Sequence, residues 1–401
     1  MLFNIYKKAF LENNNTIWWG GENHDRSWDD CTMFLYFFLV LISFYLSWKC
    51  KKFSRITLND GIKCNTTLSI SKSFYIIQFI LLCIMGLRGS WVGMDTIVYS
   101  QTFENATSLS GIFNDGSTTE PLYKIFQFFL RSFFSSRYIA IFIFSYLIIY
   151  FVFSTLKRYY NIISLKIAIP AFVCLYYFQS FSLIRIVLAA SFMLWSMPLL
   201  LAGDYKKYSL RILIATMMHF SSIVLFFPLG LLVLYKKNRI FAYSGAICSI
   251  LLIVISTNIL GEYISLINRY ENYITGNESS KQIGLALFVD YLPCLYICYY
   301  INRHKIKSNW ASLMICFTVT AFIIRLLAYY ITATGRLSFH FMALTIILLP
   351  YWINYLQKND KSKYRILYPF CIIWLLFRFH IYLKGYLASD GIMPYYFFWN
   401  D

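Results

Sequence analysis

The sequence predicts an all-α, polytopic integral membrane protein with about 11–13 transmembrane or re-entrant helices. Of its 401 residues, 59% are hydrophobic and only 13% are charged, and the mean hydropathy is +0.57. Apolar segments close to bilayer length recur along the whole chain. These segments leave no room for a soluble domain of any size, so we expect a single transmembrane domain over residues 1–401.

Hydropathy places the predicted spans one after another along the chain. Their ranges are 31–48, 73–87, 138–155, 165–181, 183–202, 208–235, 240–257, 283–301, 310–331, 336–356 and 366–384. Each is long or nearly long enough to cross about 30 Å of hydrocarbon. The range 208–235 is too short for two full spans, so we expect two short helices or a re-entrant hairpin that turns near residues 219–222.

The distribution of charge predicts the orientation. The formal net charge is +18, and 22 of the 36 Lys and Arg residues fall in six short loops, at 49–72, 157–166, 206–211, 236–239, 303–307 and 358–365. The positive-inside rule places these loops in the cytoplasm and explains the charge without nucleic acid. We therefore expect four outer segments: the N-terminal residues 1–30, the loops 88–137 and 258–282, and the tail 385–401.

Three arginines lie at the predicted outer boundary. Arg88, Arg185 and Arg336 each lie close to a turn that contains Gly or Ser, at the end of a span. Guanidinium groups stay charged and bind phosphate oxygens in a bidentate way. Three of them on one face predict an outward-facing site for an anionic group.

Three further ionisable residues lie deeper in the predicted helices. Asp290, Arg325 and Arg378 are six or seven residues inside the outer ends of their spans, which is about 10 Å at 1.5 Å per residue. Such residues usually face the bundle interior, so they are secondary candidates for the site. Two structural explanations stay open: Asp290 and Arg325 could pair with each other, and Arg378 with His380 could extend toward lipid head groups.

The first of several motifs in the chain combines an arginine, two glycines and an acid. Arg88-Gly89, followed by Gly93-Met94-Asp95-Thr96 and Tyr99, resembles the Arg-Gly, Gly-x-Asp-Thr, Tyr signature of the EpsG family, the Wzy-like polysaccharide polymerases of bacterial envelopes. Further matches keep the order of that family: Glu120-Pro121-Leu122-Tyr123, Ile184-Arg185 through Ala189-Ala190, His219-Phe220-Ser221-Ser222, and Gly335-Arg336-Leu337-Ser338 with Pro350. The resemblance covers about residues 74–356 and departs at His340, where many members carry an aromatic residue.

The resemblance implies an enzyme that joins oligosaccharide repeat units carried on polyprenyl diphosphate, at the outer face of the bacterial cytoplasmic membrane. Arg185 and Arg336, with Arg88 third, would bind the diphosphate leaving group. Asp95 and His219, with Glu120 next, would accept the proton of the attacking hydroxyl. Asp95 could instead only neutralise Arg88, and His219 could only cap its short helix.

We expect no cofactor and no metal. The one adjacent pair of acids, Asp29-Asp30, precedes the first span, and the sequence contains neither an HExxH nor a CxxC motif. The partners implied by the resemblance are the lipid-linked oligosaccharide, membrane lipid, a flippase and chain-length regulator proteins, but no nucleic acid.

Other functions compete with polymerisation. A flippase for lipid-linked oligosaccharide or another secondary transporter would also carry charges in membrane helices, although usually near the midplane rather than at one face. An O-antigen ligase shares the same chemistry, and a membrane acyltransferase could use His219 as its base. Aromatic residues of the outer loop, which includes an amphipathic helix near 119–134, and of the tail at 395–399 could either contact sugars or anchor the protein at the interface.

Overall fold

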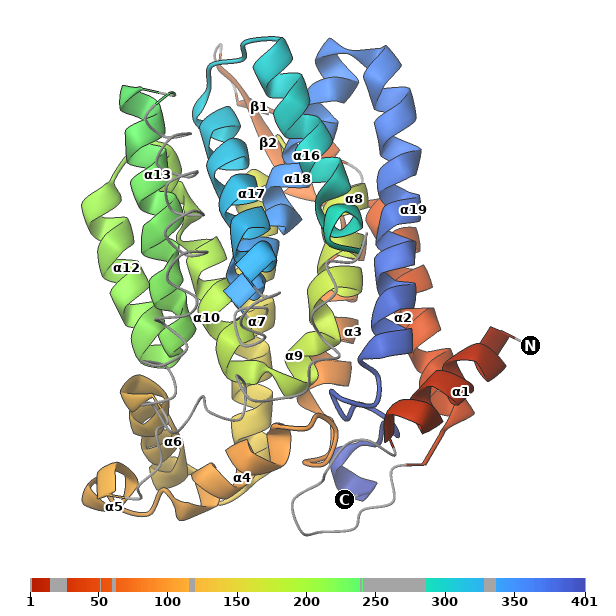
Figure 1. Cartoon of the computed structure of the whole chain (residues 1–401), viewed down its shortest axis with the longest axis vertical. Helices are drawn as coiled ribbons and strands as arrows, with labels where there is room; N and C mark the ends of the chain where they lie inside the picture. Colours follow the sequence, from red (N-terminus) through yellow and green to blue (C-terminus); the bar gives the residue numbers. More distant parts are fainter. Residues whose placement is uncertain are drawn as a thin grey trace. The chain divides into compact units, whose positions relative to one another are not determined.

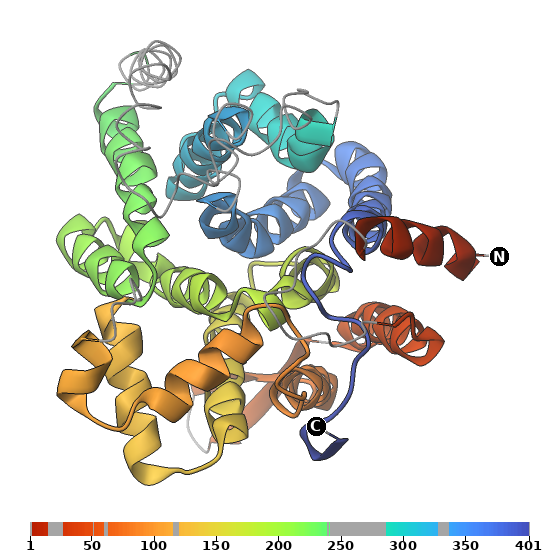
Figure 2. The same ribbon diagram turned by 60° about the horizontal axis from the view of Figure 1, so that its bottom comes forward.

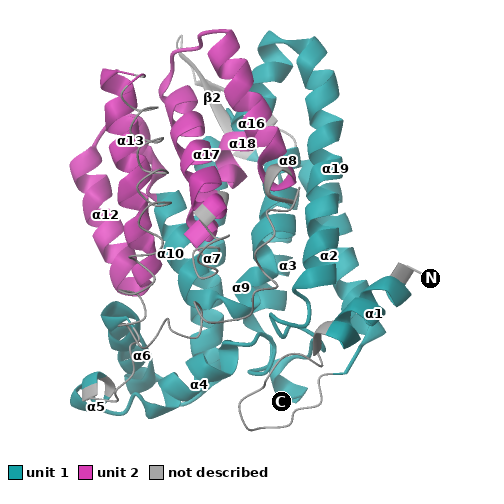
Figure 3. Ribbon diagram, viewed as in Figure 1, with its two compact units in different colours: residues 1–195, 350–401 teal, residues 196–349 magenta. Residues whose placement is uncertain are grey.

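The structure, a computed structural model, describes residues 2–14, 27–50, 52–59, 63–114, 120–238, 240, 286–327 and 337–400 (Figure 1). Arg336, the predicted loop 258–282 and all but one residue of the predicted span 240–257 lie outside this part of the chain. The chain divides into two compact units, which are coloured separately in Figure 3. Unit 1 contains residues 1–195 and 350–401, and unit 2 contains residues 196–349. The single transmembrane domain over 1–401 stays a prediction.

Unit 1 contains most of the helices. They are α1 (Leu2–Asn14), α2 (Asp30–Lys49), α3 (Lys72–Gly86), α4 (Thr96–Asn105), α5 (Leu109–Asn114), α6 (Pro121–Phe133), α7 (Arg137–Tyr159), α8 (Leu165–Phe172), the π-helix η1 (Val173–Tyr177), α9 (Gln179–Ser182), α10 (Ile184–Trp195), α19 (Lys361–Gly385) and the 3₁₀ turn η5 (Phe398–Asn400). Helix α7 packs against α3, α4 and α10, and α2 packs against α3 and α8. The core of unit 1 lies along these helices, as the burial of Ile77, Leu81, Phe144 and Ile148 shows.

Unit 2 contains α11 (Met197–Ala202), α12 (Tyr205–Met218), the 3₁₀ helix η2 (Phe220–Leu225), α13 (Phe226–Lys237), α16 (Ala286–Arg303) and α17 (Asn309–Leu327). It also contains the first half of α18 (Phe339–Asn359), because the boundary between the units falls at Pro350. Within this unit α17 packs against α13 and α16.

The predicted all-α membrane class is confirmed. In the described part of the chain, seven helices are long and apolar enough to cross a membrane: Asp30–Lys49, Arg137–Tyr159, Ile184–Ala202, Phe220–Lys237, Asn309–Leu326, Phe339–Asn359 and Lys361–Gly385. Two shorter apolar helices, Lys72–Gly86 and Leu165–Tyr177, match further predicted spans. The predicted amphipathic helix near 119–134 is α6.

The predicted turn near residues 219–222 is also confirmed. Helix α12 ends at Met218, His219 adopts an extended conformation, and η2 and α13 follow. Both α12 and α13 pack against η2, so the segment forms two short helices around a bend rather than one continuous span.

One local feature was not expected from the sequence. The basic segment 49–72 contains two antiparallel strands, β1 (Lys52–Asn59) and β2 (Lys63–Ile70), paired from Lys52 with Ile70 to Asn59 with Lys63. The segment is rich in β-branched residues, among them Ile56, Thr57, Thr66 and Thr67, which favour strands. The positive charge of the segment predicts only a loop, and the strands are the difference that the structure shows.

The Arg88-Gly89 motif joins the loop after α3 to the C-terminal tail. Four backbone hydrogen bonds connect the two segments: Gly89 N to Tyr396 O, Gly93 N to Gly391 O, Met94 N to Asp390 O and Phe398 N to Leu87 O, all 2.8–2.9 Å long. A Cβ atom on Gly89 would lie 2.1 Å from the Tyr396 ring. Glycine therefore allows the tail to pack directly on this loop.

Gly93 is required for a second reason, its backbone conformation. Its φ is +106°, and a Cβ atom there would lie 2.1 Å from the carbonyl oxygen of Phe181.

We expect Gly93→Ala to lower the thermal unfolding midpoint of the purified protein, because the substitution combines a left-handed backbone with a steric clash. Gly203→Ala is the matched control, since Gly203 has φ +77° but open space around it, so only the backbone cost of about 1–2 kcal/mol applies. Equal midpoints for the two variants would contradict the close approach at Gly93.

Helix α7 separates two ends of unit 1. It has 23 residues and is therefore about 35 Å long at 1.5 Å per residue. At its first residue, Arg137 pairs with Glu104 of α4 at 3.3 Å, and α4, α5 and α6 group at this end (Figures 1 and 2). At its other end lie Lys157 and Arg158. A helix of this length places the two ends on opposite sides of a bilayer.

Candidate active site

Three elements of unit 1, α4, α6 and α10, bring charged and aromatic side chains together. The group, here called the Arg185 cluster, comprises Asp95, Tyr99, Glu120, Tyr123, Gln127 and Arg185. It lies at the end of α7 that carries Arg137, because Tyr123 stacks on Phe144, about two turns into that helix, with ring centroids 5.3 Å apart. Asp95, Glu120 and Arg185, which were predicted separately, thus lie in one group.

Helix α6 supplies the polar wall of this cluster. Its buried residues include Tyr123, Lys124 and Gln127, whereas Phe129 and Phe133 on the opposite side are exposed. A helix of a soluble protein turns its apolar face inward. The reversed arrangement fits a helix at a membrane interface, with the apolar side chains toward lipid and the polar face toward the protein.

Arg185 is the centre of the cluster. Its guanidinium carbon lies 5.3 Å from the Tyr99 ring centroid and 5.5 Å from that of Tyr123, and these two rings contact each other at 5.8 Å on the same side of the cation. One amino group forms an ion pair with Glu120, and the Nε atom is buried without a hydrogen-bond partner among the described residues. The side chain of Arg185 keeps 18% of its surface exposed, while that of Glu120 keeps 1%. The cation is thus held by a buried carboxylate and two rings, and it remains partly exposed.

Two acids in the cluster occupy helix N-cap positions but do not cap their helices. Glu120 precedes α6 and Asp95 precedes α4, and neither side chain accepts a capping hydrogen bond. Glu120 instead reaches Arg185, and Asp95 accepts a hydrogen bond from the Tyr99 hydroxyl at 3.4 Å. Both carboxylates are therefore directed into the cluster rather than used for helix stability.

The tyrosines of the cluster remain neutral. Burial raises the pKa of Tyr99 and of Tyr123 above the ordinary value of 10. Gln127 fixes the two residues relative to each other, since its amide nitrogen donates to the Tyr123 hydroxyl at 2.6 Å and to the Tyr99 carbonyl at 3.4 Å. The aromatic walls around Arg185 are thus held in place by their own hydrogen bonds.

Arg88 has a different environment from Arg185. It is completely buried, and its guanidinium donates to the carbonyl oxygens of Met85, Val92 and Phe181 and to the Ser145 hydroxyl. Burial lowers the pKa of Arg88 to about 10, so the group is still charged at neutral pH. Asp95 is not among its partners. These contacts favour a positioning role for Arg88, which holds the Gly89–Gly93 loop against α3, α7 and α9, over the predicted contact with a diphosphate.

A second polar group lies in unit 2. His340 of α18 and Ser221 of η2 are hydrogen-bonded, with 2.8 Å between Nε2 and Oγ, and His340 is buried. The Nδ1 atom of His340 has no hydrogen-bond partner among the described residues. His219 is partly exposed at the junction of α12 and η2, where it occupies the N-cap position of η2, but its side chain forms no capping hydrogen bond, so the capping alternative is not supported. Unit 2 therefore presents two histidines and a serine, of which only His219 was predicted as a site residue.

The secondary candidates lie outside both groups. Asp290 of α16 and Arg325 of α17 form an ion pair with 4.0 Å between Oδ2 and Nε, which confirms the structural explanation for these two residues. Arg378 is partly exposed on α19, and its neighbour His380 bonds the Tyr6 hydroxyl of α1 through Nδ1 at 2.7 Å. In the described part of the chain, no three His, Cys, Asp or Glu side chains are grouped so that they could hold a metal ion.

Sequence reasoning missed several members of these groups. Tyr123, Lys124 and Gln127 were not predicted; they follow the predicted Glu120 at helical spacing and share one face of α6. This polar stripe on an otherwise apolar helix was the available signal. His340 gave a weaker signal, because it is a histidine where the motif expects an aromatic residue. Its contact with Ser221 joins positions 119 residues apart, so no local sequence pattern indicates it.

The fold and the Arg185 cluster define a multi-pass helical membrane protein with a buried, arginine-centred polar site at one end of its helices. The chain belongs to the EpsG family: the sequence model of that family matches residues 72–397. The family comprises Wzy-like polysaccharide polymerases and exopolysaccharide biosynthesis proteins. Comparison with curated proteins and with solved structures gives no match. The family match extends beyond the resemblance seen at about 74–356, and it includes the tail that packs on the Arg88-Gly89 loop.

Proposed function

We propose that this protein polymerises oligosaccharide repeat units carried on polyprenyl diphosphate, at the outer face of the bacterial cytoplasmic membrane. Membership of the EpsG family supports a role in polysaccharide biosynthesis. The observation that carries the finer proposal is the environment of Arg185, a cation in contact with two tyrosine rings, paired with one carboxylate and still partly exposed.

The chemistry of repeat-unit transfer matches this environment. The bond between the sugar and the lipid diphosphate breaks, the diphosphate leaves with the bonding electron pair, and a hydroxyl of the second repeat unit forms the new glycosidic bond. Arg185 would stabilise the negative charge that develops on the diphosphate, and Glu120 would position Arg185. Asp95 would accept the proton of the attacking hydroxyl, with Tyr99 fixing its carboxylate. His219, beside Ser221 and His340 in unit 2, is the second candidate for the base. Arg336 remains a candidate for the diphosphate.

The outer location is supported by the two ends of α7. The Arg185 cluster lies at the end with Arg137, and the basic residues Lys157, Arg158 and Lys166 lie at the other. Cytoplasmic ends of membrane helices carry the excess of Lys and Arg. The cluster would then face outward, on the side where finished repeat units are exposed.

Cysteine labelling tests this orientation. In a Cys31→Ser background, which removes an exposed native thiol, Thr107→Cys lies between α4 and α5 at the cluster end and Lys361→Cys begins α19. Both positions are exposed. We expect an impermeant thiol reagent to modify Thr107→Cys in intact cells and Lys361→Cys only after the membrane is opened. The reverse pattern would contradict the outward-facing site.

Deletion of the gene tests the reaction itself. Loss of a polymerase leaves single repeat units on the lipid carrier at the outer face, because export continues while elongation stops. Loss of a flippase leaves no exported repeat unit at all. Sizing the lipid-linked glycan of the deletion strain, with and without the wild-type gene on a plasmid, distinguishes the two, and long glycan in the deletion strain would contradict both.

A further inference from the structure

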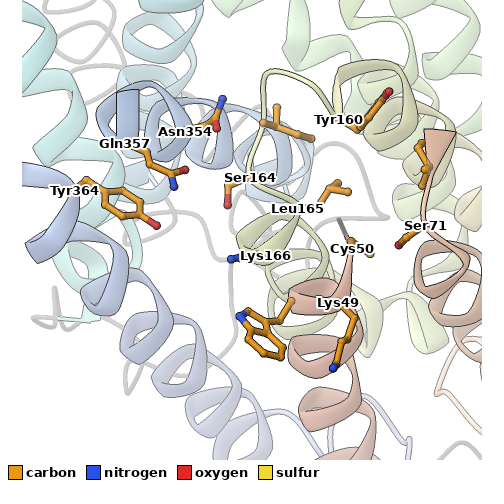
Figure 4. A pocket seen from close by; sticks show the side chains of 13 residues that line it. Lys49, Cys50, Ser71, Tyr160, Ser164, Leu165, Lys166, Asn354, Gln357 and Tyr364 are labelled. Carbon is orange, nitrogen blue, oxygen red and sulfur yellow. The ribbon is translucent and has the colours of Figure 1, made fainter. Parts of the chain in front are cut away.

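A cavity lies in unit 1 at the other end of α7 from the Arg185 cluster. It has a volume of about 660 Å³ and is lined by the C-terminal end of α2, the segment after α7, the start of α8 and parts of α18 and α19. Figure 4 shows Ser164 and Lys166 between Tyr364 and Gln357 on one side and Cys50 and Ser71 on the other. The volume is within the range of small-molecule sites, and the proposed polymerisation does not use it.

The charge of this cavity favours an anion. Lys49 and Lys166 belong to its lining, and none of the described lining residues is Asp or Glu. The ammonium group of Lys49 lies 5.2 Å from the Trp48 ring centroid, so an aromatic ring supports one of the two cations. An anionic group in this cavity would meet two positive charges and no acid.

Two helices also begin at the cavity. Ser71 is the N-cap residue of α3 and Ser164 that of α8, and neither side chain forms a capping hydrogen bond. The first N–H groups of a helix have no partner within it and carry the positive end of the helix dipole. The cavity therefore combines two cations with the N-termini of two helices, a set suited to phosphate oxygens.

We propose that this cavity binds the phosphate group of a small anionic ligand, at the face of the membrane opposite the Arg185 cluster. Two sources share this chemistry: the head group of an anionic phospholipid and a water-soluble phosphate ester. The position of the cavity at the ends of apolar helices, with Trp48 and Tyr364 at its edge, suits a lipid head group, since these residue types concentrate at membrane interfaces.

The test uses the full-length protein purified in detergent, with three probes and two kinds of variant. The probes are phosphatidylglycerol, zwitterionic phosphatidylcholine and glycerol 3-phosphate, with lipid binding measured by native mass spectrometry and the soluble ester by thermal shift. The double variant Lys49→Gln/Lys166→Gln removes both cavity cations. Lys157→Gln is the matched control, because Lys157 is exposed at the same end of α7 but does not line the cavity.

We expect phosphatidylglycerol to bind the wild type more tightly than phosphatidylcholine does. Binding should weaken by at least about fivefold in the double variant, since one basic residue near a charged surface contributes about 1 kcal/mol. Phosphatidylglycerol binding should stay near the wild-type value in Lys157→Gln. A higher salt concentration should weaken this binding more in the wild type than in the double variant.

The possible outcomes distinguish a lipid ligand from a soluble ester, and both from failure of the proposal. A lysine-dependent effect with phosphatidylglycerol alone assigns the cavity to lipid, and one with glycerol 3-phosphate alone assigns it to a soluble ester. An effect with both shows that the phosphate group suffices. If no probe distinguishes the double variant from Lys157→Gln, the cavity is not a phosphate site, whatever the glycan assays show for Arg185.

Discussion

Arg185→Lys is expected to reduce glycan polymerisation by about 100-fold, the loss typical when one donor to a developing negative charge is removed. Lysine keeps the positive charge but replaces a planar fork of donors by a point charge, so it cannot hold Glu120 and a diphosphate oxygen in the same geometry. It also gives up the cation–π contacts of the guanidinium with Tyr99 and Tyr123. The amount of long glycan per molecule of membrane-embedded protein measures the effect.

The chain offers a matched control for this experiment. Arg137 also pairs with a glutamate, Glu104, but its side chain is 33% exposed and lies outside the cluster. Exposed ion pairs of this kind contribute only about 0–1 kcal/mol. Arg137→Lys should therefore leave the glycan unchanged. Full-length glycan from Arg185→Lys at normal protein level would remove Arg185 from the reaction.

Much of the fold was predictable because it depends on local sequence. The span of a membrane helix follows from about 20 successive apolar residues, and the bend at His219 followed from a segment too short for two crossings. Local irregularities within the helices were harder to predict from the sequence. The predicted span 165–181 is interrupted by the π-helix η1, which has no hydropathy signal, whereas the break at Leu183 falls where the predicted spans 165–181 and 183–202 meet.

The site was predictable in its residues but only partly in their roles. Motif resemblance pointed to Asp95, Glu120 and Arg185 without showing that they meet, because α4, α6 and α10 are far apart in sequence. Arg88 shows the opposite case. An arginine beside two glycines suggests an open ligand site, yet here the glycines admit the C-terminal tail and the arginine binds backbone carbonyls. Sequence gives the donors of a guanidinium but not the acceptors that they meet.

Asp95→Asn is expected to lower polymerisation by about 100-fold to 10,000-fold, the contribution of a well-placed general base. The substitution keeps the size of the side chain and a hydrogen-bond acceptor for Tyr99, but it removes the group that takes up the proton. It should not weaken α4, because the Asp95 side chain does not cap that helix. Protein level and thermal unfolding should stay at the wild-type values, and Glu104→Gln, at the same end of unit 1, should leave the glycan unchanged.

The same experiment decides between the two candidate bases. If His219, next to Ser221 and His340, accepts the proton instead, His219→Gln should abolish elongation while Asp95→Asn retains it. Retained elongation in Asp95→Asn together with its loss in His219→Gln would move the proton acceptor from the Arg185 cluster to unit 2, and Asp95 would then only orient Tyr99.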